Sequence, residues 1–213
     1  MTAGRIVLVR HGETDYNREA RVQGNIDIPL NETGRAQAAR CAELLPRYLS
    51  GRTVGRIVAS PLSRAADTAV ALGAALGVDP VADGRLRERA FGEFEGLNRA
   101  ELEEYRAEEY RLWMADEPPE EMGVEPKLDV VARVSEAVLE HAEELGPEET
   151  LVAVGHGSST GLLIASLIGL DPERGWPLRG LENCHWSELA HQPDRDPVWQ
   201  LRHHNVGAGL FGD

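Results

Sequence analysis

The segment Arg5-Ile-Val-Leu-Val-Arg-His-Gly12 places a continuous apolar run before polar and small residues. A run without polar alternation is typical of a strand buried on both faces of a parallel sheet. The same order returns where Leu151–Val154 leads into Gly155-His-Gly157. His11 and His156 are therefore predicted at the carboxyl ends of two buried strands, which is the edge where open α/β sheets bind ligands.

Helical patterns separate these strands. Apolar residues recur three or four positions apart after Thr33, after Ser60-Pro61 and after Pro126. Ser60 is expected to cap its helix, with Pro61 as the first helical residue. The buried faces expected for the three helices are Ala38, Cys41, Ala42, Leu45 and Leu49; Ala65, Ala69, Leu72 and Leu76; and Leu128, Val131, Val134, Val138 and Leu145.

Further short strands are expected at residues 56–59, around Val81, at 184–189 and at 199–203, and a helix is expected to end near Ile168. Strands and helices thus alternate along most of the chain. We predict a single α/β domain over residues 1–213, folded as an α/β sandwich with a mainly parallel central sheet.

The composition is that of a globular protein. The chain has 213 residues, of which 42% are hydrophobic and 27% charged. No apolar run approaches the roughly 20 residues that span a bilayer, and Ile6–Val9 is too short for a signal peptide. Cys41 and Cys184 lie far apart without CxxC spacing, so neither a disulfide framework nor a zinc ribbon is indicated. We expect a soluble, cytoplasmic protein.

The charge is unevenly distributed. The net charge is −14, which argues against nucleic acid and anionic membranes as partners. Residues 1–64 nevertheless carry ten arginines against six acidic residues, whereas residues 98–149 carry five basic against seventeen acidic residues. The first part can host an anion site, and residues 98–125 are expected to form an acidic, helical, lid-like insertion.

Polar residues at the predicted sheet edge fit the binding of a phosphoryl group. Arg10 and Arg64 supply charge, while Thr14 and Asn17 supply neutral donors. Gly12 is expected to let a substrate approach the backbone. An isolated histidine is more often structural, but two histidines beside two arginines can bind and transfer a phosphoryl group.

The transfer needs an acid for the leaving alkoxide, and Glu88 is the candidate. The alternative for Glu88 is a surface ion pair with Arg85 or Arg89. There is no HExxH, HxH or CxxC pattern, so no metal site is expected.

The chain resembles the histidine phosphatase superfamily, in its phosphoglycerate mutase-like branch. The resemblance rests on an ordered set of motifs spread over residues 5–190. They are Leu8-Val-Arg-His-Gly-Glu-Thr-Asp-Tyr-Asn17, Gln23-Gly24, Pro29-Leu30, Thr33–Ala38, Ala59–Arg64, Leu86, Glu88, Phe91-Gly92, Glu95-Gly96, Gly155–Gly157 and Asn183-Cys184.

The resemblance implies a three-layer α/β/α fold with a mainly parallel sheet and a phosphohistidine intermediate on His11, and it implies neither a metal nor an organic cofactor. Arg10, Arg64 and His156 would hold the phosphoryl group, and a protonated Glu88 would serve as proton donor. The residues implied or considered for substrate binding are Thr14, Asn17, Gln23, Gly24, Arg89 and Gly157. His11 would attack as a neutral imidazole whose other nitrogen donates to a backbone carbonyl in the Gly12 loop.

Hydrolysis of a small phosphate ester is the favoured activity, and transfer of the phosphoglycerate mutase type is the alternative. Mutases usually carry tyrosine where Phe91 stands, and an acidic segment suits a bisphosphorylated intermediate poorly. Residues 184–189 resemble actinobacterial phosphatases that act on glucosyl-3-phosphoglycerate. A non-catalytic phospho-ligand-binding protein is a second alternative. A homodimer is considered because dimers are common among soluble proteins.

Overall fold

The computed structural model describes residues 1–174 and 178–207 and has a six-stranded sheet at its centre. The strand order is β3-β2-β4-β1-β5-β6. The first four strands of that order are parallel: β3 (Pro80–Ala82), β2 (Thr53–Ala59), β4 (Glu149–Gly155) and β1 (Arg5–Arg10). The remaining two, β5 (Trp186–His191) and β6 (Trp199–Val206), run antiparallel to their neighbours.

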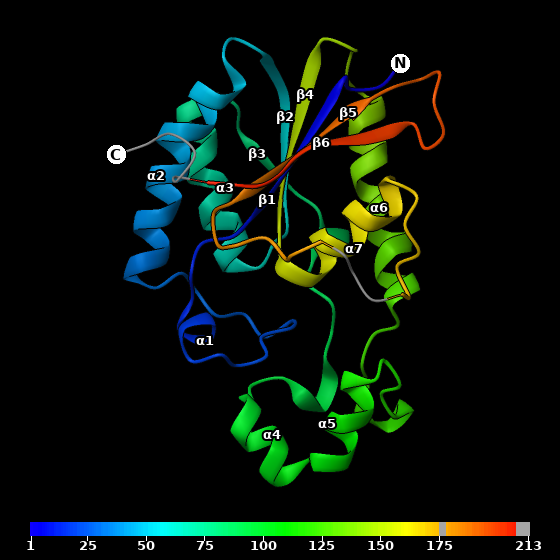
Figure 1. The fold of residues 1–213 in the computed structure, drawn as a ribbon. Helices are drawn as coiled ribbons and strands as arrows, with labels where there is room; N and C mark the ends of the chain where they lie inside the picture. Colours follow the sequence, from blue (N-terminus) through cyan, green and yellow to red (C-terminus); the bar gives the residue numbers. More distant parts are fainter. Residues whose placement is uncertain (175–177, 208–213) are drawn as a thin grey trace.

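Helices cover both faces of this sheet (Figure 1). One layer holds α2 (Glu32–Leu49) and α3 (Ser63–Leu76), and the other holds α6 (Lys127–Glu143) and α7 (Gly157–Leu167). Successive residues of β1 point to opposite layers, because Ile6 packs with the α6–α7 cluster and Val7 with the α2–α3 cluster. The predicted three-layer sandwich with a mainly parallel sheet is confirmed.

The start of α3 differs from the prediction by two residues, since the helix begins at Ser63 and not at Pro61. Ser60 still belongs to the sheet's hydrogen bonding, because its N–H donates to the Val154 carbonyl at 3.0 Å. The Ser60 hydroxyl accepts from the Leu62 N–H at 3.3 Å and so closes a turn before the helix begins. Ser60 is therefore not the helix cap, and Pro61 is not helical.

The buried face of α6 is also rotated from the predicted one. Val130, Val134 and Val138 form its buried ridge, whereas Leu128 is 50% exposed. Leu128 lies two residues before Val130, which places it about 200° around the helix from that ridge. Its assignment to the core was wrong.

The acidic segment is helical, as expected, and contains two short α-helices. α4 (Arg99–Tyr105) and α5 (Ala107–Met114) meet at Arg106, whose φ of −142° is not helical. They lie beyond the carboxyl ends of the parallel strands, apart from the sandwich (Figure 1). A small cluster around buried Phe94, Leu102 and Met122 holds them together.

Short elements complete the architecture of the described ranges. They are α1 (Asp15–Arg18), η1 (Gly84–Leu86), η2 (Gly92–Phe94) and η3 (Glu120–Met122). Among residues 1–174 and 178–207, we find no helix whose length and apolar character would let it span a membrane.

Candidate active site

The two His-Gly elements meet at one edge of the sheet. β1 and β4 are neighbours in register, with Arg10 opposite Gly155, so His11 and His156 follow their strands at the same level. Their ring centroids are 5.2 Å apart, and both side chains are buried. The juxtaposition predicted from the two sequence motifs is confirmed.

The hydrogen bond of His11 fixes the position of its proton. Nδ1 lies 2.6 Å from the Gly12 carbonyl oxygen, which can only accept, so Nδ1 carries the hydrogen. Nε2 therefore keeps its lone pair. Burial, followed by the charges of Arg10 and Arg64, lowers the pKa of His11 well below 6.5. The neutral imidazole held by the Gly12 loop is as expected.

His156 adopts the opposite tautomer. The Arg64 Nε donates to His156 Nδ1 at 3.2 Å, so the neutral ring carries its hydrogen on Nε2. Burial and the neighbouring His11, Arg64 and Arg10 lower the pKa of His156 well below 6.5. Its buried Nε2 has no hydrogen-bond partner within the described part of the chain, which marks it as a donor available to a ligand.

Two arginines supply fixed positive charge beside these rings. Arg64 is fully buried and donates to the carbonyls of Ile26 and Gly24, each at 2.8 Å. Arg10 donates to the Leu181 carbonyl at 2.7 Å, while its buried Nε finds no partner among residues 1–174 and 178–207. Burial lowers the pKa of both guanidinium groups, but arginine remains charged in proteins.

Glu88 is buried at the N-terminus of α7. Its Oε2 accepts from the Ser158 N–H at 2.9 Å, and its Oε1 accepts from the Ser159 N–H at 2.7 Å. The alternative of a surface ion pair is wrong, because Arg85 pairs with Asp83 and the Arg89 Nε donates to the Glu125 carbonyl. A carboxyl group thus faces the same edge as the histidines and arginines.

Two glycines lie in the His-Gly elements, and the space around them differs. A Cβ on Gly157 would lie 3.6 Å from the Arg10 guanidinium carbon and 3.9 Å from Glu88 Oε2, so Gly157 adjoins both groups. A Cβ on Gly12 would lie 2.5 Å from the Gly34 carbonyl oxygen. Close packing against the start of α2 therefore requires glycine at position 12, a reason different from the substrate approach expected above.

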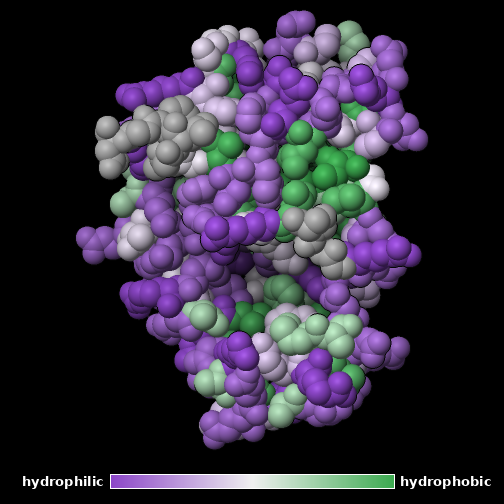
Figure 2. All heavy atoms as spheres, viewed as in Figure 1, coloured by the Kyte–Doolittle hydropathy of each residue, from purple (hydrophilic) through white to green (hydrophobic). Residues whose placement is uncertain are grey.

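These groups share one cleft of about 300 Å³. Figure 2 shows a hollow between the part that contains α4 and α5 and the rest of the molecule. Of the predicted residues, Arg10, His11, Asn17, Gln23, Gly24, Arg64, Glu88 and Gly157 line the cleft. His156 lies buried beside it, next to His11.

Thr14 and Arg89 lie outside the cleft lining. Thr14 is buried and caps α1, and its hydroxyl bonds to Gln23 Oε1 at 2.8 Å. The Arg89 guanidinium is 5.7 Å from the ring centre of Phe91 and is tied to the segment that ends the acidic insertion. Both are placed to support residues that do line the cleft.

Sequence reasoning missed most of the opposite wall. The additional lining residues are Arg21, Val22, Phe91, Trp113, Ser158, Gly180 and Leu181. Trp113 packs on Phe94, with ring centroids 4.7 Å apart, and on Phe91, at 5.4 Å. In the sequence, only the aromatic residues within 91–113 pointed to this wall. Their contacts depend on how α4 and α5 fold back, which the local pattern does not show.

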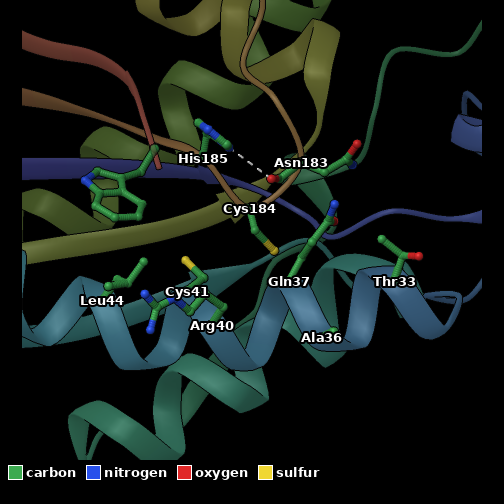
Figure 3. A pocket seen from close by; sticks show the side chains of 10 residues that line it. Thr33, Ala36, Gln37, Arg40, Cys41, Leu44, Asn183, Cys184 and His185 are labelled. Carbon is green, nitrogen blue, oxygen red and sulfur yellow. Dashed lines mark hydrogen bonds between the residues drawn. The ribbon is translucent and has the colours of Figure 1, made fainter. Parts of the chain in front are cut away.

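A second cavity, of about 330 Å³, lies between α2 and the segment that precedes β5 (Figure 3). Cys41 and Cys184 both line it, although they are 143 positions apart in the sequence. Both are free thiols and buried. Asn183 and Cys184 also bind the backbone that follows β1. The Cys184 N–H donates to the Arg10 carbonyl at 3.0 Å, and Asn183 Nδ2 donates to the His11 carbonyl at 2.9 Å.

Comparison with known proteins identifies the family. Residues 6–206 match the model of the histidine phosphatase superfamily, branch 1. The chain is 39% identical to glucosyl-3-phosphoglycerate phosphatase of Mycobacterium tuberculosis, over 100% of this chain and 99% of that protein. It is 33% identical to a probable phosphoglycerate mutase GpmB of Cronobacter sakazakii, over 88% of this chain and 85% of that protein.

The solved structures agree. A mycobacterial glucosyl-3-phosphoglycerate phosphatase in complex with vanadate superposes with a TM-score of 0.83 at 36% identity, over 95% of this chain and 99% of that one. The fold is thus phosphoglycerate mutase-like. The chain belongs to branch 1 of the histidine phosphatase superfamily and is a phosphomonoesterase.

Proposed function

We propose that the chain hydrolyses a small phosphate monoester in two steps, with His11 Nε2 as the nucleophile. The observation that carries the proposal is the pair of neutral imidazoles with opposite tautomers. His11 offers a lone pair on Nε2 and His156 offers an N–H on Nε2, and the charges of Arg10 and Arg64 act on both rings. One ring suits attack on phosphorus, and the other suits hydrogen bonding to a phosphoryl oxygen.

In the first step, His11 Nε2 forms a bond to phosphorus while the bond from phosphorus to the ester oxygen breaks. Arg10 Nε, His156 Nε2 and the remaining Arg64 N–H groups donate to the phosphoryl oxygens, which spreads their negative charge. Glu88 gives its proton to the departing alkoxide. The phosphate-binding groups are already in place, since backbone carbonyls hold both arginines.

In the second step, water attacks phosphorus and the bond to His11 breaks. Glu88, now a carboxylate, accepts the proton of the attacking water. His11 returns as a neutral ring because the Gly12 carbonyl still holds the hydrogen on Nδ1. No step requires a metal ion, and we expect activity in excess EDTA.

The acidic segment favours hydrolysis over mutase chemistry. Residues 98–125 carry ten acidic and three basic side chains, and we assign this segment the role of a lid over the cleft. A mutase must retain a doubly phosphorylated intermediate, which a negatively charged lid repels. Release of phosphate to water faces no such demand.

We propose that the substrate is glucosyl-3-phosphoglycerate, the compound that appears in the names of the mycobacterial relatives. Beyond the phosphate site, Phe91 and Trp113 form an aromatic wall. Ligand pockets commonly combine such apolar walls with a few fixed polar groups. The aromatic faces can pack against the C–H groups of a sugar ring, which would favour a glucosylated substrate over 3-phosphoglycerate itself.

The test measures phosphate release in excess EDTA from glucosyl-3-phosphoglycerate, 3-phosphoglycerate and p-nitrophenyl phosphate. We expect the glucosylated ester to have the highest kcat/KM and His11→Ala to abolish release from all three. His203→Ala is the matched control, because His203 lies outside the cleft. Retained release by pure His11→Ala, or interconversion of phosphoglycerates that outpaces hydrolysis, would overturn the proposal.

A further inference from the structure

Arg133, on helix α6, binds the backbone of the segment that carries Glu88. Its Nη1 donates to the carbonyls of Arg85 at 2.7 Å and Arg87 at 2.8 Å. Its Nη2 donates to the carbonyl of Glu88 itself at 3.0 Å. The side chain is 22% exposed and lies outside the cleft lining. Three carbonyls of the segment that carries Glu88 therefore bind one guanidinium group.

Glu125 completes the arrangement from the end of the acidic segment. Its Oε1 accepts from Arg133 Nε at 2.7 Å, and its Oε2 accepts from Arg133 Nη2 at 2.8 Å. The same Oε2 accepts from the Ala90 N–H at 3.1 Å. All five N–H groups of Arg133 are thus engaged. Although burial opposes ionisation, the Arg133 and Ala90 hydrogen bonds hold the pKa of Glu125 below its usual range.

The two ends of the Glu88 residue are consequently held by two different helices. The backbone of residues 85–90 is fixed to α6 through Arg133 and Glu125, and the carboxyl group is fixed to α7 through Ser158 and Ser159. The position of the carboxyl relative to His11 depends on both attachments, and proton transfer falls off sharply when the donor moves from hydrogen-bonding reach of its acceptor.

We infer that Arg133 and Glu125 are positioning residues that aim the Glu88 carboxyl at the leaving-group oxygen. Because kcat/KM reports the steps up to the departure of that oxygen, it isolates their effect on the acid step from their effect on the later attack of water. The inference rests on the proposed role of Glu88. A merely structural ion pair would lower activity toward every ester in the same proportion, or lower only stability. A positioning role predicts a loss that depends on how much the leaving group needs a proton.

The experiment compares two esters in each variant. p-Nitrophenolate is a weak base and leaves without a proton, whereas the alkoxide of an alkyl ester such as glycerol 3-phosphate needs one. We expect Arg133→Met and Glu125→Gln to lower kcat/KM for the alkyl ester by about tenfold or more, within the range of general acid catalysis, and to change kcat/KM for the aryl ester by less than about threefold. Arg133→Lys should recover part of the loss.

Arg40→Met is the control, because Arg40 forms an exposed ion pair with Glu43 on α2, away from Glu88. Glu88→Gln is the benchmark, because it should lower kcat/KM for the alkyl ester selectively and by more than the other two variants do. If Arg133→Met does not fold, Glu125→Gln decides, since it keeps the size of the side chain while it removes the charge and one of the two acceptor oxygens that bind Arg133 and Ala90. Equal losses for both esters, or no loss, would overturn the inference.

Failure of the proposed function would look different. In that case the wild type would release no phosphate from either ester, or Glu88→Gln itself would show no dependence on the leaving group.

Discussion

At the scale of single residues, the chemistry depends on where two protons sit. His11 holds its hydrogen against the Gly12 carbonyl, and His156 accepts from Arg64 and keeps its hydrogen on Nε2. The ordered motifs of the family resemblance predicted His11, Arg10, Arg64, Glu88 and His156 as one group, whereas the residues alone left a surface ion pair open for Glu88. It could not predict the Glu88 contacts with α7, because they join residues 70 positions apart.

The lowered pKa values of His11 and His156 predict a specific pH response. Each ring stays neutral as the pH falls past 6.5, the usual histidine pKa, because burial and nearby arginines oppose its protonation. NMR titration of the two ring signals, assigned with His11→Asn and His156→Asn, should show no protonation until well below that value. A midpoint near 6.5 for His11 would contradict the electrostatic account.

The lowered pKa values of His11 and His156 also determine how the stability of the fold changes with pH. In the unfolded chain these histidines become protonated near their ordinary pKa of 6.5, whereas in the folded chain their pKa values are lower. Below pH 6.5 the unfolded state therefore binds more protons than the folded state. Their contribution to stability is complete above that pH and is lost as the pH falls toward the lowered pKa values. Denaturant unfolding should show this acid loss reduced in His156→Asn relative to wild type.

At the scale of elements, apolar patterns predicted the strands and helices of the sandwich, because each helix buries one consistent face and the central strands β1 and β4 bury both of theirs. It failed where tertiary contacts override local pattern. Ser60 stays in the sheet's hydrogen bonding and delays α3, and the acidic stretch breaks at Arg106 into α4 and α5. The aromatic wall of the cleft was missed for the same reason.

Trp113 should act on the choice of substrate. It lines the cleft and packs on Phe94 and Phe91. Trp113→Ala should raise KM for the glucosylated ester by about tenfold, the cost of about 1.4 kcal/mol of lost contact, and should change KM for 3-phosphoglycerate much less. Steady-state kinetics with both esters measures the ratio, with Tyr105→Ala, an exposed side chain on α4, as the control. An unchanged KM ratio would remove Trp113 from the sugar site.

At the scale of the whole molecule, two hydrophobic layers support one catalytic edge. Leu45 on α2 and Leu163 on α7 are both buried, on opposite faces of the sheet. Leu45→Ala and Leu163→Ala should each lower the free energy of unfolding by about 2–5 kcal/mol. Leu45 and Leu163 belong to two separate hydrophobic clusters. The two losses of unfolding free energy should therefore add to within about 0.5 kcal/mol in the double variant. Urea unfolding of the three variants and the wild type tests this, and strong coupling would argue against independent layers.

The central claim is covalent transfer to His11, and its most direct test is to trap the intermediate. Glu88→Gln should still be phosphorylated by p-nitrophenyl phosphate, whose leaving group needs no proton, but should hydrolyse the intermediate slowly because the water lacks its base. Alkaline quenching preserves phosphohistidine for peptide mapping by mass spectrometry. We predict one phosphoryl group, stable in alkali and labile in acid, on His11. A phosphoryl group on another residue, or nitrophenolate release with no phosphopeptide, would contradict the mechanism.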